Sequence, residues 1–461
     1  MTRNILIVLL LAGISTSLRA QDIAPFRKGD RVTFVGNSIT DGGHYHSYIW
    51  LYYMTHFPTM RLWMSNCGVG GDTAHSIWAR LDDDVLSRQP TVLTLTFGMN
   101  DSGYYEYNGT DPQGFADRQV AQSVTNFDSI RRRLTTLQDT RIIMLGTSPY
   151  DQTSRFNQDI FHGKNDAMRR IVAYQQATAQ AEKWEFLDFN APMTRINEER
   201  QQTDSTFTLC GTDRIHPDND GHMVMAYLFL KAQGMAGQKV ADVEIDAARR
   251  KVLRSENCKI TTLRSREGTV SFDYLARSLP YPMDPVARGW GFSRPQSDAV
   301  KVIPTLMDDL SNERLTVRGL QGRYELRIDD TLIDTLTAMQ LTQGVNLATY
   351  THTPQYQQAL TVMALNERRW EIERGLREYA WVQYNFFLGK GMLHQNDAEA
   401  EQAMWEAGAD NAWLKGYRGM YARLRHAESR QMDERQMKLL VKRIYQINRP
   451  VKRHIVLRPV D

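Results

Sequence analysis

Two short stretches of the chain carry side chains that could together cleave an ester. The stretch GNSIT contains Ser38 at the end of an apolar run, and the stretch DRIHPDNDGH contains Asp213 and His216, three residues apart. A serine hydroxyl is a weak nucleophile at neutral pH, so it needs a base that is itself oriented by an acid. We therefore expect Ser38 to be the nucleophile, His216 the base and Asp213 the orienting acid.

Two further stretches could hold the negative charge that develops when a serine attacks a carbonyl. NCGVGGDT at 66–73 has three glycines, whose backbone amides can approach a bound group closely. TFGMND at 96–101 offers the side-chain amide of Asn100 as a second donor. Each stretch alone is equally compatible with a turn, and Ser38 alone with a helix N-cap. Their combination indicates a hydrolytic site.

Other histidines and tyrosines near these stretches have fewer features of catalytic residues. His222 follows His216 inside a helical pattern, which favours a packing or surface position. His44 and His46 form an H-x-H pair without the carboxylates or cysteines of a metal site, so a substrate-facing or supporting role is the better interpretation. The tyrosines of DSGYYEY at 101–107 either line the pocket or are half-buried loop residues.

The elements that would position these groups form a pattern of alternating strands and helices. Between Arg31 and about His222, short β-rich runs alternate with longer helix-compatible segments, which is typical of parallel βαβ units. The expected strands are 31–35, 61–66, 91–97, 141–146 and 184–189. We expect an open, mostly parallel α/β sheet with helices on both faces. Ligands of such sheets bind beyond the carboxyl ends of the strands, where the four stretches lie.

The sequence changes character after about residue 237. Alternating runs near 315–317 and 324–328 predict antiparallel hairpins, and 454–460 predicts a last strand. Between them, 354–447 has helical periodicity, with later helices expected at about 397–427 and 432–447. We expect a β-sandwich-like module with a helical insertion. Core packing is the preferred interpretation of the helical tryptophans, which are Trp370, Trp381, Trp405 and Trp413.

Composition and the N-terminus limit the functional classes. The chain has 461 residues, 42% of them hydrophobic, and a formal net charge of +3, so neither disorder nor binding to nucleic acid is indicated. Residues 1–20 have the charged, apolar and small-residue regions of a secretory signal, with cleavage expected after Ala20. No later segment predicts a membrane span. We expect a secreted or periplasmic protein with a domain over 24–236 and a second over 237–461; oligomeric state stays open.

Three cysteines are present: Cys67, Cys210 and Cys258. Their odd number leaves at least one unpaired, and no two have the close spacing of metal ligands. Cys67 and Cys210 each lie beside a candidate stretch, so a disulfide between them is one hypothesis for an exported protein. It requires their α-carbons to lie within roughly 7 Å. Three free thiols is the alternative.

Residues 28–236 resemble the SGNH hydrolase superfamily, the GDSL-type esterases and lipases, and their flavodoxin-like fold. The resemblance implies that Ser38 is the nucleophile, that Asp213 and His216 complete the triad, and that the amides of Ser38 and Gly71 with the Asn100 side chain form the oxyanion hole. No metal or cofactor is implied. The first block departs from the usual Gly-Asp-Ser, because Asn37 precedes the serine. Asn can make similar local hydrogen bonds through its carbonyl oxygen.

The sequence thus predicts a serine ester hydrolase. Family analogy, expected export and the added sandwich-like module favour removal of acetyl or other short acyl groups from carbohydrate, as a small-molecule or polysaccharide ester. Two alternatives stay open, namely a catalytically silent carbohydrate-binding protein and an acyl transferase that uses the same residues.

Overall fold

The computed structural model describes residues 23–155, 160–289 and 293–460, so the expected signal peptide over 1–20 lies outside the described residues. Five parallel strands form the first sheet, in the spatial order β2-β1-β3-β4-β5. They are β1 (Arg31–Gly36), β2 (Trp63–Gly68), β3 (Val92–Leu95), β4 (Arg141–Gly146) and β5 (Glu185–Asp188). Each end lies within two residues of the expected strand, and the expected parallel α/β sheet is confirmed.

Helices cover both faces of this sheet. Val32 and Phe34 of β1 lie in one apolar core, whereas Val35 lies in another, because successive side chains of a strand point to opposite faces. The helices and helical turns of this region are α1 (Ser38–Asp41), α2 (Tyr45–His56), α3 (Ala74–Arg80), η1 (Leu81–Val85), η2 (Leu86–Arg88), η3 (Tyr105–Asn108), α4 (Pro112–Leu134), α5 (Lys164–Glu182), α6 (Asn190–Gln201) and α7 (Asn219–Ala232). Burial on both faces explains the continuous apolar runs of the strands.

Two further sheets follow and share an apolar core. The second sheet has the order β13-β10-β6-β7 and the third the order β12-β11-β14-β9-β8. Val243, Leu326 and Phe272, from both sheets, lie in that one core. The strands are β6 (Lys239–Asp246), β7 (Lys251–Glu256), β8 (Cys258–Arg266), β9 (Thr269–Ala276), β10 (Asn312–Arg318), β11 (Arg323–Ile328), β12 (Thr331–Thr337), β13 (Val345–Asn346) and β14 (Arg453–Val460).

One of the expected hairpins is wrong. β10 does not pair with β11 but runs parallel to β6 in the other sheet. Gly319 and Gly322 have φ of +78° and +82°, so the connection can turn away from a hairpin path and cross between sheets. The β11–β12 hairpin does form, and β14 returns between β11 and β9, as the last strand was expected to do.

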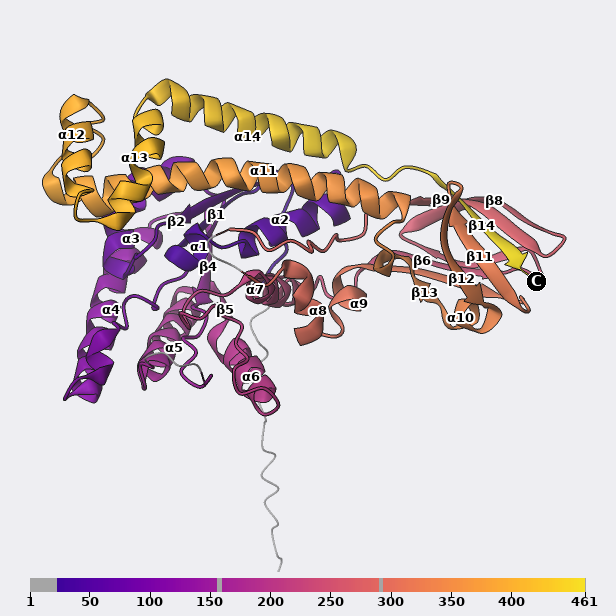
Figure 1. The fold of residues 1–461 in the computed structure, drawn as a ribbon, viewed down its shortest axis with the longest axis horizontal. Coiled ribbons are helices and arrows are strands. Elements are labelled where there is room, and N and C mark those ends of the chain that lie inside the picture. Colours follow the sequence, from indigo (N-terminus) through magenta and orange to yellow (C-terminus); the bar gives the residue numbers. More distant parts are fainter. Residues whose placement is uncertain (1–22, 156–159, 290–292, 461) are drawn as a thin grey trace, which may run out of the picture.

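Helices interrupt this second region before its last strand. α11 and α14 run side by side from the two small sheets to α12 and α13 at the far end of the molecule (Figure 1). One helix expected at 397–427 is two, because the Asn411 side chain accepts hydrogen bonds from backbone N–H groups and begins a new helix. The bounds are η4 (Gln296–Asp298), α8 (Ala299–Val302), α9 (Leu306–Leu310), α10 (Ala338–Gln343), η5 (Leu347–Thr349), α11 (Pro354–Val382), η6 (Gln383–Phe387), η7 (Leu388–Lys390), α12 (Ala398–Ala407), α13 (Ala412–Leu424) and α14 (Ala427–Ile447).

The inserted helices pack on the first sheet domain. Val362 of α11 and Ile444 of α14 lie in the same apolar core as Phe34 of β1 and Ile49 of α2. Figure 1 shows α11 lying along this domain over most of its length. None of the helices in the described ranges is long and apolar enough to cross a membrane. The insertion is therefore placed to contribute to a site on the first domain.

The cysteine pair considered above does not form. Cys67, Cys210 and Cys258 are all free and buried. Cys67 packs in the core beside Val35 on one face of the first sheet, whereas the Cys210 thiol faces the carbonyl of Pro149. The two side chains are thus directed into different surroundings.

We expect thiol titration of unreduced protein to detect three thiols after unfolding and almost none before it, because burial shields all three. A reagent such as 5,5′-dithiobis(2-nitrobenzoic acid), used with and without guanidinium chloride, measures both numbers. One thiol in the unfolded, unreduced protein would contradict the structure.

Candidate active site

The first candidate stretch forms a sharp turn between β1 and α1. The Asn37 side chain accepts a hydrogen bond from the Ile39 backbone N–H at 3.0 Å and caps the helical turn that Ser38 begins. A β-carbon on Gly36 would lie 2.2 Å from the Thr40 hydroxyl oxygen, so only glycine fits before this turn. Asn37 makes the local bond expected from its carbonyl oxygen, and Ser38 is held at the end of the strand.

His216 lies between Ser38 and Asp213. Its Nε2 is 2.8 Å from Ser38 Oγ, and its Nδ1 is 2.5 Å from Asp213 Oδ2. A base that touches the nucleophile through one ring nitrogen and a carboxylate through the other is the arrangement that serine hydrolysis requires. The structure therefore brings the three residues expected from sequence into hydrogen-bond contact.

Hydrogen bonds within the loop hold Asp213 and His216 in position. Asp213 Oδ1 accepts the backbone N–H groups of Ile215 and His216 at 2.9 and 3.1 Å. Burial raises the pKa of Asp213, but the hydrogen bonds and charge of His216, with these two N–H groups, outweigh it and hold the pKa below its usual value. Asp213 consequently stays ionised beside the imidazole.

Arg214 supports the same loop and was not foreseen from sequence. Its backbone is left-handed, with φ of +67°, and its side chain is buried. Nη1 donates to the carbonyls of Asp151 and Ser154 at 3.2 and 2.9 Å and to the Ser154 hydroxyl at 2.7 Å. A charged residue between Asp213 and His216 in sequence resembles a solvated loop residue, so nothing in the local pattern indicated this brace.

Gly71 and Asn100 line the same cavity as Ser38, which has a volume of about 550 Å³. Gly71 has φ of +86°, a conformation that favours glycine. Asn100 Nδ2 donates to the Asp72 carbonyl at 2.8 Å, and Asn100 Oδ1 accepts from the Tyr104 hydroxyl at 2.6 Å. These bonds fix the side-chain amide, whose second Nδ2 hydrogen can serve as an oxyanion donor. Of the loop tyrosines, Tyr104 lines the cavity.

A buried lysine supports the Asn100 loop. Lys164 Nζ donates to the Met99 carbonyl at 2.6 Å, the Ser102 hydroxyl at 2.7 Å and the Gly103 carbonyl at 2.5 Å. It also lies 3.8 Å from the centre of the Tyr104 ring. Burial lowers the pKa of Lys164 to about 7. Three acceptors satisfy its three donors, so the loop around Asn100 is built on this ammonium group.

The inserted helices provide one wall of the cavity. Trp381, Trp413 and Tyr417 line it, with Trp381 and Tyr417 in edge contact at 5.2 Å between ring centres. Asn385 Nδ2 donates to the Gly70 carbonyl at 3.3 Å and so ties the insertion to the glycine-rich stretch. A site that begins at Ser38 is thus completed more than 300 residues later in the chain.

Core packing explains only part of the helical tryptophans. Trp370 is buried and stacks on His44 at 3.9 Å, as expected. Trp405 and Trp413, however, are 52% and 55% exposed, and Trp381 faces the cavity. Trp381 also packs against the buried core between the inserted helices, so the expectation holds for it in part and fails for Trp405 and Trp413. Periodicity places a residue on a helix face but does not say what that face meets.

Asp41 also lines the cavity, one helical turn after Ser38. Its Oδ2 accepts the Gly70 N–H at 3.1 Å. Burial raises the pKa of Asp41 to about 7, against the opposing effects of the Arg377 charge and the Gly70 hydrogen bond. This carboxyl was not singled out from sequence, because it lies outside every motif that marks the reacting groups.

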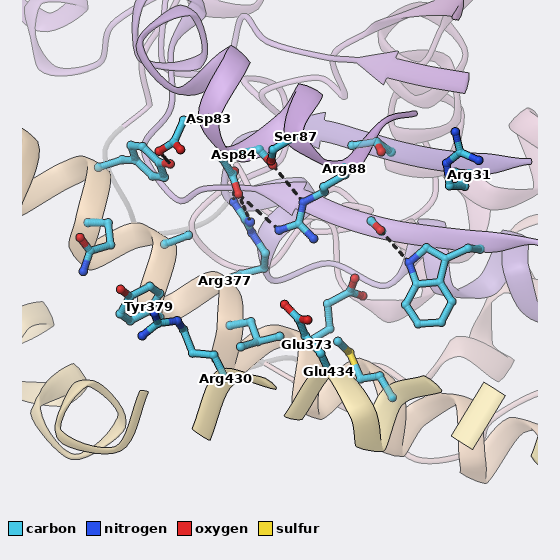
Figure 2. A pocket seen from close by; sticks show the side chains of 18 of the residues that line it. Arg31, Asp83, Asp84, Ser87, Arg88, Glu373, Arg377, Tyr379, Arg430 and Glu434 are labelled. Atoms are coloured by element: carbon cyan, nitrogen blue, oxygen red, sulfur yellow. Dashed lines mark hydrogen bonds and ion pairs between the residues drawn. The ribbon is translucent and has the colours of Figure 1, made fainter. Parts of the chain in front are cut away.

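A buried ion-pair network joins the insertion to the glycine-rich stretch, and Figure 2 shows its contact between Arg377 and Asp84. Arg377 of α11 makes two hydrogen bonds to Asp84, at 2.8 and 2.7 Å, and donates through Nε to the Gly68 carbonyl at 2.9 Å. Arg80 bridges Asp84 and Asp72 at 2.6 and 2.7 Å. Burial acts to raise the pKa of Asp84, but the surrounding guanidinium groups hold it well below its usual value. Asp72 and Gly68 flank Gly71, so the network supports the expected oxyanion donor.

The other three histidines named from the sequence lie outside the cavity. His44 lies 3.2 Å from Glu367 of α11, and His46 Nε2 lies 3.2 Å from the Thr40 carbonyl. Both are buried and neither lines the cavity, so of the two roles considered for them the supporting one agrees with the structure and the substrate-facing one does not. His222 is buried in α7 and stacks on Tyr45, in agreement with the packing role expected for it.

Models of known protein families match both regions of the chain. A family model described as the GDSL-like lipase/acylhydrolase family matches residues 34–224, and one described as the diltiazem deacetylase C-terminal helical domain matches residues 360–449. A solved structure described as a gut microbial diltiazem-metabolizing enzyme is 52% identical, covers 96% of this chain and 100% of its own, and has a TM-score of 0.94. The chain belongs to the GDSL-like lipase/acylhydrolase family. It is a carboxylic ester hydrolase of the GDSL type.

More distant relatives match less than half of the chain. An acetylxylan esterase from Geobacillus stearothermophilus is 24% identical over 223 residues, which is 45% of this chain and 94% of the relative. A crystal structure of an acetylxylan esterase from the same organism is 21% identical, covers 45% of this chain and 95% of its own, and has a TM-score of 0.37.

We expect Arg377→Met to destabilise the hydrolase by about 3–5 kcal/mol, because it leaves the Asp84 carboxylate buried without its bidentate partner. Arg374→Met is the matched control on the same helix, since Arg374 pairs with Glu378 near the surface and should cost about 1 kcal/mol or less. Urea unfolding followed by tryptophan fluorescence measures both. Equal losses in the two variants would contradict a special role for the network.

We expect Lys164→Met to lower kcat for a simple ester by up to about 100-fold, because the Asn100 loop loses its common donor and shifts. Circular dichroism checks that the variant is folded. Lys183→Met, at the end of α5, is the control and should keep full activity. A folded Lys164→Met variant with unchanged kcat would show that the loop holds its position without the lysine.

Proposed function

We propose that the hydrolase cleaves acyl esters through Ser38, His216 and Asp213, with Gly71 and Asn100 in the oxyanion hole. The observation that carries the proposal is the continuous contact from Ser38 Oγ to His216 at 2.8 Å and from His216 to Asp213 at 2.5 Å, inside a cavity. This arrangement favours a catalytic protein over the silent binding protein that the sequence left open.

The mechanism follows from these contacts. His216 takes the proton of Ser38 as the serine oxygen attacks the ester carbonyl, and Asp213 stabilises the imidazolium that forms. The carbonyl oxygen becomes negative and is held by the backbone amides of Ser38 and Gly71 and by Asn100 Nδ2. His216 then gives its proton to the departing alcohol. A water molecule, activated by the same imidazole, releases the acyl group and restores Ser38.

The substrate we propose is an acetyl or other short acyl ester of a small molecule that carries a ring. Two observations support this choice: the aromatic wall formed by Trp381, Trp413 and Tyr417, and the 52% identical relative described as metabolizing diltiazem. An acetylated carbohydrate, which is the substrate expected from sequence, is now the second candidate, because aromatic faces also stack on sugar rings and a relative is an acetylxylan esterase. Parallel assays with acetylated aromatic alcohols and acetylated xylo-oligosaccharides separate the two.

The chain's location and domain limits also belong to the proposal. We propose export with cleavage after Ala20, a hydrolase domain over 24–236 and a second region over 237–461 whose two sheets form a β-sandwich-like module. N-terminal sequencing of the mature protein tests the cleavage site. Product analysis with added alcohol acceptors distinguishes hydrolysis from acyl transfer.

We expect Ser38→Ala to lower hydrolysis of p-nitrophenyl acetate by at least about 10⁴-fold, because the nucleophile is lost. Asn100→Ala should cost about 100- to 1000-fold, since one of several oxyanion donors is removed. Ser205→Ala, on the surface, is the matched control and should match the parent. An active Ser38→Ala variant would refute the assigned nucleophile.

A further inference from the structure

The active-site cavity combines carboxylates with aromatic rings and has no basic side chain of the lysine or arginine type among the described residues that line it. Its carboxylates are Asp41 and Asp213. Asp213 is committed to His216. Asp41 is therefore the acidic group that remains for a ligand, and the cavity as built is unfavourable for an anionic one.

Asp41 and the aromatic wall meet beside Gly70. A β-carbon on Gly70 would lie 3.4 Å from Trp381 Cδ1 and 3.6 Å from Asp41 Oδ2, so the indole and the carboxylate flank the same glycine. Tyr417 contacts Trp381 at 5.2 Å between ring centres, and Trp413 lies 6.4 Å from Tyr417. A carboxylate next to a group of aromatic rings is the environment that binds substituted ammonium ions.

Arg377 and Arg374, the two positive charges that act on Asp41, are paired with other groups. Arg377 is engaged by Asp84 and the Gly68 carbonyl, and Arg374 pairs with Glu378 at 3.3 Å. Across the described ranges, no lysine or arginine lies within ion-pair distance of Asp41, whose side chain accepts the Gly70 N–H. Above its pKa of about 7, Asp41 carries a negative charge in the cavity without an ion-pair partner, which favours a ligand that supplies one.

We propose that this cavity selects acyl esters whose alcohol part carries a positively charged amine, with Asp41 as its counter-ion and Trp381 and Tyr417 as the faces that contact it. The inference rests on the proposed function, because it places the amine in the cavity where Ser38 attacks the ester. It assigns substrate selection to two elements: the turn that follows the nucleophile, and the inserted helices.

A pair of esters of the same shape tests this inference. Acetylcholine and 3,3-dimethylbutyl acetate differ in that a positively charged nitrogen replaces a neutral carbon. Each is added as a competitor of p-nitrophenyl acetate hydrolysis, so its inhibition constant is measured whether or not it is itself cleaved. At pH 8 the Asp41 carboxyl, whose pKa burial raises to about 7, is ionised. We expect acetylcholine to compete at about tenfold lower concentration than the neutral ester.

Two variants test whether Asp41 and Trp381 cause the preference for the charged ester. Asp41→Asn keeps an oxygen acceptor for the Gly70 N–H but removes the charge, and should bring the ratio of the two inhibition constants to within about twofold of one. Trp381→Leu should reduce the ratio about threefold or more, because one aromatic face is lost. Glu106→Gln, an exposed carboxylate in η3 outside the cavity, is the control and should leave the ratio unchanged. Effects common to both esters cancel in the ratio.

Equal inhibition constants in the parent protein would overturn the inference, as would a preference that Asp41→Asn does not reduce. Either result leaves the proposed function standing, provided that p-nitrophenyl acetate is hydrolysed and Ser38→Ala abolishes that hydrolysis. Absence of Ser38-dependent hydrolysis would instead refute the proposed function itself.

Discussion

The buried contact between Arg377 and Asp84 is the constraint on which the arrangement of the two regions depends. Two charged groups taken out of water are costly unless each is fully paired, and here every partner is in place. Arg377 comes from the inserted helix, Asp84 from the turn after α3, and Arg80 carries the network on to Asp72. Glu373 of the same helix accepts the backbone N–H of Asn66 in β2. α11 is thereby fixed in one position along the first sheet domain.

That position gives the active site its two parts. The proposed reacting groups come from the ends of strands and the loops after them, where a parallel sheet gathers them. The wall opposite comes from α11, η6 and α13, which are inserted before the last strand of a different sheet. The proposed reacting groups thus come from the first sheet domain, whereas the proposed substrate contacts come from the inserted helices and from Asp41, which lies in the same helical turn as Ser38.

The sequence was sufficient for the parts that depend on local signals. The five strands are apolar runs bounded by turn residues, and Ser38, Asn100, Asp213 and His216 each follow such a run or loop, so their approximate place was predictable. Pairing between residues far apart in the sequence was not predictable. Asp84 and Arg377 are 293 residues apart and look like ordinary charged helix residues. β10 was assigned to the wrong partner for a similar reason, since pairing with β6 depends on a crossover that no local pattern shows. Trp381 has helical spacing whether it faces a core or a cavity, and Asp41 belongs to no motif.

Covalent labelling of the nucleophile tests the central claim most directly. A fluorophosphonate reacts with a serine only when a base activates it and an oxyanion hole holds the phosphoryl oxygen. The account predicts that the intact hydrolase takes up one equivalent, that peptide mass spectrometry places the label on Ser38, and that activity is lost in proportion. A stoichiometric label on another serine, or full activity in protein labelled at Ser38, would contradict it.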